Sequence, residues 1–130
     1  MSAHSSWVAI SLIAVWAGQA SAQSVAPNTI EIVSVAGCLR ERGADNWMLV
    51  AATEPVPSIA NAPQAKELPT TPPDGKNTFK LIGVAEFGLP TYRDRTVVVK
   101  GLWIKATPVG RLNITSVVPA LPACAPGAPK

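Results

Sequence analysis

Thirteen prolines set the strongest limit on what this chain can fold into. All of them lie after residue 22, and ten fall within residues 54–77 and 119–130. A proline inside a helix removes a hydrogen bond and clashes with the preceding turn, so this density excludes long helices there. Elsewhere, β-branched and apolar residues alternate with polar ones, which is the period of a β-strand. We therefore predict an all-β protein with irregular connections.

Five segments carry strand patterns, at residues 30–40, 47–53, 78–84, 96–106 and 111–118. In the second segment, Trp47, Leu49 and Ala51 are expected to share one face. Two long connections interrupt the series: the proline-rich residues 54–77, and residues 86–95, where glycine and proline allow one helical turn at most. A tight turn at residues 108–110 predicts a hairpin between the last two strands.

The N-terminal segment has the composition of a secretory signal. Residues 1–22 contain none of the 11 basic and 8 acidic side chains, and residues 7–17 are apolar apart from Ser11. This run is shorter than the ~20 residues that span a membrane, and Ala20-Ser21-Ala22 has small residues where a signal peptidase cuts. An uncleaved anchor or a buried helix is the alternative. We expect cleavage between Ala22 and Gln23, a periplasmic or secreted location, and one mature domain over residues 23–130.

Two cysteines remain in the mature chain, Cys38 in the first predicted strand and Cys124 in the tail. An even number of cysteines in an oxidising compartment favours one disulfide, and two buried free thiols are the alternative. Residues 35–38 also resemble a lipidation box, but they stand too far from the apolar run. We expect a Cys38–Cys124 disulfide that ties residues 119–130 to the first strand as a strap.

Glycines inside the predicted strands favour a closed sheet. Gly37, Gly83 and Gly101 are each expected on an inner face, where glycine marks a bend or a close backbone approach. A small barrel needs such points because its strands coil sharply to close. The strand order predicts a small five-stranded OB-like Greek-key barrel over residues 30–118, with a proline-rich insertion and a disulfide-tethered C-terminal strap.

Five short motifs follow one another in this order: V-x-V-x-G-C-L from Val33, W-x-L from Trp47, F-x-L-x-G from Phe79, V-x-V-x-G from Val97 and L-x-I-T-S-V from Leu112. With the late Cys124, the series resembles small exported bacterial proteins of unknown function that have an OB-like barrel. The resemblance implies a barrel and a disulfide from the first strand to the tail, and it implies no catalytic residues. The insertion at residues 54–77 and the connection at residues 86–95 depart from that pattern.

The mature chain lacks the side chains of several common active sites. Its only histidine, His4, lies in the predicted signal, which excludes imidazole-dependent catalysis and histidine metal sites. No phosphate-binding loop or dinucleotide fingerprint is present. The carboxylates fall mostly in predicted loops, where a solvated role is expected. We expect no enzyme, no metal and no cofactor, with a carboxylate-dependent hydrolase as a minor alternative.

Two surfaces are candidates for binding. In the first, Tyr92, Arg93 and Arg95 could hold an anion, and outward-pointing Lys80 and Lys100 would extend this basic surface. A solvated turn with a local Arg–Asp pair is the alternative. The second surface is an outward apolar set, comprising Met48, Val50, Ile82, Val98, Leu102 and Ile104. We expect the insertion and the tail to cover this set, and a contact surface is the alternative.

These observations predict an exported, non-enzymatic binding protein of the bacterial cell envelope. The sequence does not identify its ligand. The alternative is a structural or inhibitor-like module that docks on another periplasmic protein. Single-stranded nucleic acid is a less expected ligand, because alternation turns Trp47, Phe79 and Trp103 inward and leaves few aromatic rings for stacking.

Overall fold

The computed structural model describes residue 13, residues 31–58, residue 63 and residues 65–130. Apart from residue 13, the predicted signal lies outside the described residues, as do its cleavage site at Ala22 and Gln23 and part of the insertion. The described part contains strands and two short 3-10 helices but no α-helix, which confirms the all-β prediction. No helix in this part is long and apolar enough to cross a membrane.

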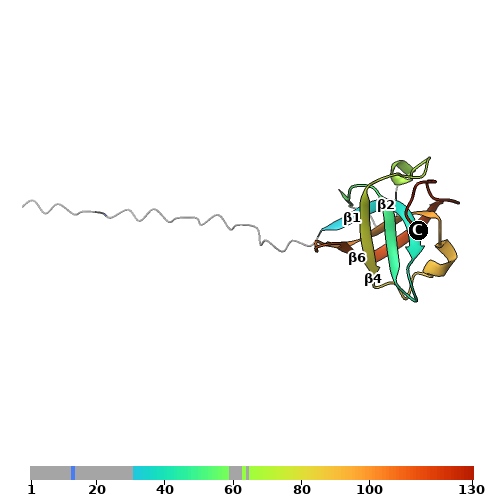
Figure 1. Ribbon diagram of the computed structural model, residues 1–130. Helices are drawn as coiled ribbons and strands as arrows, with labels where there is room; N and C mark the ends of the chain where they lie inside the picture. Colours follow the sequence, from blue (N-terminus) through green and yellow to red (C-terminus); the bar gives the residue numbers. More distant parts are fainter. Residues whose placement is uncertain (1–12, 14–30, 59–62, 64) are drawn as a thin grey trace, which may run out of the picture.

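The strands are β1 (Ile32–Glu41), β2 (Trp47–Ala52), β3 (Val56–Pro57), β4 (Asn77–Ile82), β5 (Thr96–Ile104) and β6 (Gly110–Leu121), and the 3-10 helices are η1 (Ala65–Glu67) and η2 (Leu89–Tyr92). Hydrogen bonds join the long strands in the order β1–β2–β4–β6–β5 and back to β1, so the sheet closes into a ring. Every pair is antiparallel except β4 with β6. Figure 1 shows the strands curling around a common centre.

The five predicted strands are present, but the number of strands and several strand ends are wrong: β4 ends at Ile82 instead of residue 84, and β5 ends at Ile104 instead of residue 106. The sixth strand, β3, lies in the proline-rich insertion and pairs with β1 through Val33–Pro57 and Ser34–Val56. The strand β6 also continues to Leu121 instead of ending at residue 118, so the strap begins later than predicted. Pro119 is tolerated there because the register of β5 and β6 shifts beside it, and a proline can occupy such an irregular position.

The expected position of Ala51 is also wrong. The pairing of β2 with β4 shifts register between Leu49 and Ala52, and Ala51 has a left-handed φ of 48°. This bulge turns Ala51 to the outer cluster with Met48 and Val50, and Ala52 takes the inner position. Simple alternation does not reveal such an extra residue.

The main core fills the inside of the ring. Its buried side chains come from all five long strands and from η2: Val33, Val35, Leu39, Trp47, Leu49, Ala52, Phe79, Leu81, Leu89, Val97, Val99, Leu112 and Ile114. The single turn of η2 agrees with the limit that Gly88 and Pro90 set on residues 86–95. Because Leu89 is buried in the core, this connection is held firmly against the ring.

Close approach between β5 and β6 explains the glycine at position 101. A Cβ atom there would collide with the backbone oxygen of Asn113. Gly37 is similarly crowded, since its Cβ would lie 2.9 Å from Cγ of Leu49. Gly83 differs from the prediction: it follows β4 and has a φ of 69°, so it serves a turn rather than an inner strand position.

We expect Gly101→Ala to lower the free energy of unfolding by about 1–3 kcal/mol, because the new methyl group forces β5 and β6 apart. The control is Gly127→Ala, where the nearest atom to an added Cβ is a carboxylate oxygen of Asp74 at 4.0 Å. Urea unfolding of both variants measures the difference. Equal stability of the two variants would contradict the close packing at Gly101.

Candidate functional site

The predicted disulfide is present and holds the C-terminal strap on the sheet. Cys38 and Cys124 are bonded, with their Cα atoms 5.4 Å apart. Beyond the bond, Arg40 Nε donates a hydrogen bond to the Pro129 carbonyl at 3.0 Å. Ala128 packs in an apolar cluster with Met48, Val50, Ala51 and Cys38. The strap therefore covers the outer face where β1 meets β2.

The insertion covers a second part of the outer face, where β1 meets β5. Lys100 lies there beside Ser34 and is completely buried. Its ammonium lies 3.1 Å from a carboxylate oxygen of Glu67, at the end of η1. The prediction that Lys100 belongs to an exposed basic surface is therefore wrong. Alternation placed it on the correct face, but the insertion folds over that face and supplies a carboxylate.

The other residues of the predicted basic surface do not form one site. Arg93 pairs with Glu41, with Nη2 and Oε1 3.2 Å apart, and its guanidinium lies 5.6 Å from the centre of the Trp47 ring. Arg95 donates from Nε to a backbone oxygen at 3.4 Å.

Tyr92 packs against the main core, and Lys80 is exposed on β4. Asp94 bonds to Arg40 at 2.8 Å rather than to a neighbouring arginine. The loop arginines thus make structural contacts.

The outward apolar set is covered in part. Met48, Val50 and Val98 are buried, whereas Ile104 is 41% exposed. Ile82 and Leu102 are half-buried. The insertion was expected to provide cover, but its residues Val56 and Leu68 are themselves 51% and 37% exposed.

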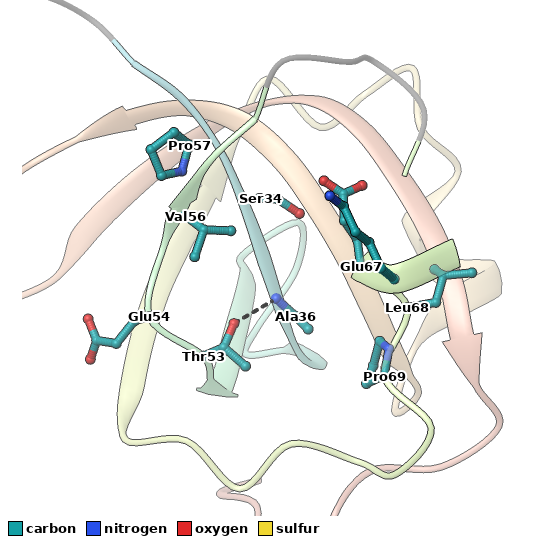
Figure 2. Close-up of a pocket in the computed structure, with 10 residues that line it drawn as sticks. Ser34, Ala36, Thr53, Glu54, Val56, Pro57, Glu67, Leu68 and Pro69 are labelled. Carbon is teal, nitrogen blue, oxygen red and sulfur yellow. Dashed lines mark hydrogen bonds between the residues drawn. The ribbon is translucent and has the colours of Figure 1, made fainter. Parts of the chain in front are cut away.

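These two side chains line a pocket of about 570 Å³ between β1, β3 and η1, which we call the insertion pocket. Its lining residues are Ser34, Ala36, Thr53, Glu54, Val56, Pro57, Lys66, Glu67, Leu68 and Pro69. Figure 2 shows Val56 and Pro57 on one side, Leu68 and Pro69 on the other, and β1 between them.

The chemistry of the insertion pocket suits an apolar ligand with a few polar groups. Ser34 and Ala36 come from the outer face of β1 and form its floor, since their neighbours Val33 and Val35 point into the core. Thr53 Oγ1 accepts a hydrogen bond from the Ala36 amide at 3.1 Å, drawn as a dashed line in Figure 2. The Glu67 carboxylate is held by Lys100. Among the residues that the structure describes, no histidine or cysteine lines this pocket.

A second pocket of about 490 Å³, which we call the hairpin pocket, lies at the turn between β5 and β6. Its lining residues are Glu54, Pro55, Lys76, Asn77, Thr78, Phe79, Trp103, Lys105, Ala106, Pro108, Val109 and Gly110. The expectation that Trp103 points inward holds only in part, because its indole packs against the core but stays partly exposed in this pocket.

Neither pocket was found from the sequence. The only sequence signal of the insertion pocket is the set of apolar residues in the insertion, and these residues predict cover for the sheet rather than a pocket. Within the described residues, no three side chains of His, Cys, Asp or Glu gather as a metal site would require. Comparison of the chain with protein-family models, with curated proteins and with solved structures found no match.

Proposed function

We propose that this protein is an exported, non-enzymatic binding protein of the bacterial cell envelope with an OB-like fold. Two observations support the fold. First, β1 is hydrogen-bonded to both β2 and β5, which closes a ring of five long strands. Second, η2 lies between β4 and β5, the third and fourth long strands, where an OB-fold is interrupted. The disulfide supports a location outside the reducing cytosol.

The insertion pocket carries the proposed binding function. Its volume of about 570 Å³ lies in the range of about 300–1,000 Å³ that is usual for small-molecule sites. Apolar side chains lie on two opposite sides of it, Val56 and Pro57 on one and Leu68 and Pro69 on the other. The side that carries Leu68 is fastened to the sheet by the ion pair of Glu67 with completely buried Lys100. A wall held in this way needs little ordering when a ligand enters, which favours affinity. We infer a small, mostly apolar ligand.

The test uses Nile red, a neutral dye that fluoresces in apolar surroundings. We expect saturable binding to the full chain, and we expect Val56→Asp to weaken it by about tenfold, because a charge in the apolar wall must be desolvated. Native mass spectrometry of the same preparation would show any ligand that remains bound through purification.

The matched control is Ile104→Asp. Ile104 is 41% exposed, comparable to Val56 at 51%, and it does not line the insertion pocket. It should leave the dye affinity unchanged. Equal weakening by both variants, or no saturable binding at all, would contradict a ligand site in this pocket.

A further inference from the structure

The hairpin pocket is separate from the insertion pocket and has a different chemistry. It lies where the end of β5 meets the starts of β4 and β6, whereas β1, β3 and η1 bound the insertion pocket. Of the residues described in the structure, Glu54 alone lines both pockets.

The charges around the hairpin pocket are predominantly positive. Lys76 and Lys105 are exposed, and neither takes part in the three ion pairs that the described residues form. Glu54 Oε1 accepts a hydrogen bond from Asn77 Nδ2 at 2.9 Å, and it pairs with neither lysine. The pocket therefore presents two ammonium groups that pair with no carboxylate of the described residues and that an anion could bind.

Two more cations extend this positive field along the sheet. Lys80 and Arg111 are exposed register partners on the parallel strands β4 and β6. Each directly follows a residue that lines the pocket, Phe79 and Gly110 respectively. Neither belongs to an ion pair of the described residues. Such a cluster of one sign attracts anions to the mouth of the pocket.

An indole lies beside these cations. Trp103 is partly exposed and meets buried Phe79 edge to face, with ring centres 6.4 Å apart and planes at 85°. The Lys105 ammonium lies 4.7 Å from the centre of the Trp103 ring. Gly110 leaves room for the indole, since a Cβ there would lie 3.2 Å from Trp103 Nε1. The pocket thus places one fixed aromatic surface within reach of a cation.

We propose that the hairpin pocket binds an anionic saccharide. The apolar C–H surface of a sugar ring would pack on the indole of Trp103, and its carboxylate, sulfate or phosphate would bind Lys76 and Lys105. A single-stranded nucleic acid fits less well. It needs several aromatic platforms for successive bases, whereas Trp103 is the one partly exposed ring among the residues that line this pocket.

The test is calorimetric titration of the full chain with trigalacturonic acid, an oligosaccharide with a carboxylate on each ring. The variant Lys76→Gln/Lys105→Gln should bind it about tenfold more weakly, because both charge-assisted contacts are lost. The control Arg42→Gln/Lys130→Gln removes the same charge from exposed positions outside both pockets. This control should change the affinity for trigalacturonic acid less than about twofold, because salt screens charges that are far from the bound saccharide.

Three comparisons separate the alternatives. Neutral maltotriose and an oligo-thymidylate should bind more weakly than trigalacturonic acid, and Val56→Asp in the insertion pocket should leave saccharide binding unchanged. Tighter binding of the oligo-thymidylate would assign the pocket to nucleic acid and overturn the proposal. Equal affinity for maltotriose, equal loss in the control variant, or no saccharide binding would also overturn it. None of these results decides whether the insertion pocket binds Nile red, so the two proposals can fail separately.

Discussion

Replacing Glu67 with Gln is expected to lower the free energy of unfolding by about 3–5 kcal/mol. Lys100 is completely buried and its ammonium lies 3.1 Å from the Glu67 carboxylate, so the substitution leaves a buried charge without its counter-ion. Glutamine has almost the same shape as glutamate, so the packing of η1 changes little. Urea unfolding measures the loss, and it can be followed by tryptophan fluorescence, to which buried Trp47 contributes.

A double variant separates the charge from the packing. Lys100→Met combined with Glu67→Leu removes both charges together, and its stability should return to that of the natural protein or exceed it. Asp94→Asn is the control, because Asp94 is 60% exposed in its pair with Arg40 and should lose about 1 kcal/mol or less. A loss from Glu67→Gln no larger than that of Asp94→Asn would show that the buried pair does not hold the insertion.

Breaking the disulfide should have an effect of similar size. The bond joins positions separated by 86 residues, and the chain-entropy argument gives a stabilisation of about 4 kcal/mol for such a loop. Cys38→Ala and Cys124→Ala should each lower the free energy of unfolding by about this amount. The double variant should add little, because either single change already breaks the bond.

The mass of the protein provides the matching measurement. Under our proposal of export, the chain recovered after secretion begins at Gln23 and is two hydrogens lighter than the dithiol form. A dithiol mass, or losses from the two single variants that add in the double variant, would contradict a disulfide that stabilises the exported protein. Reduction should also release the strap and expose the apolar cluster around Met48 and Val50.

The strands were predictable because their signal is local. Alternation in residues such as Val97 and Val99 shows which side chains enter the core, and the structure confirms it for these positions. The hairpin between β5 and β6 was equally visible, but the predicted turn at residues 108–110 is wrong in its bounds, because the connection runs over residues 105–109 and Gly110 begins β6. The bulge at Ala51 and the short strand β3 escaped prediction, since each depends on a partner strand distant in the sequence.

The candidate sites escaped prediction for the same reason. Alternation along β5 predicts that Lys100 points into solvent. It is buried and pairs with Glu67 only because η1 folds over that face of the sheet. Likewise, Lys76 and Lys105 stand 29 positions apart in the printed sequence and line one pocket only after β4, β6 and β5 have aligned.

The sequence by itself determined the β class, the positions of the long strands and the pair of cysteines available for bonding. These follow from proline content, alternation and residue type, which act over a few neighbouring residues. Only the tertiary structure decided which faces are covered, which charges are buried and where the pockets lie. Such properties arise from contacts between distant segments, and no local pattern records which segment will fold over which face.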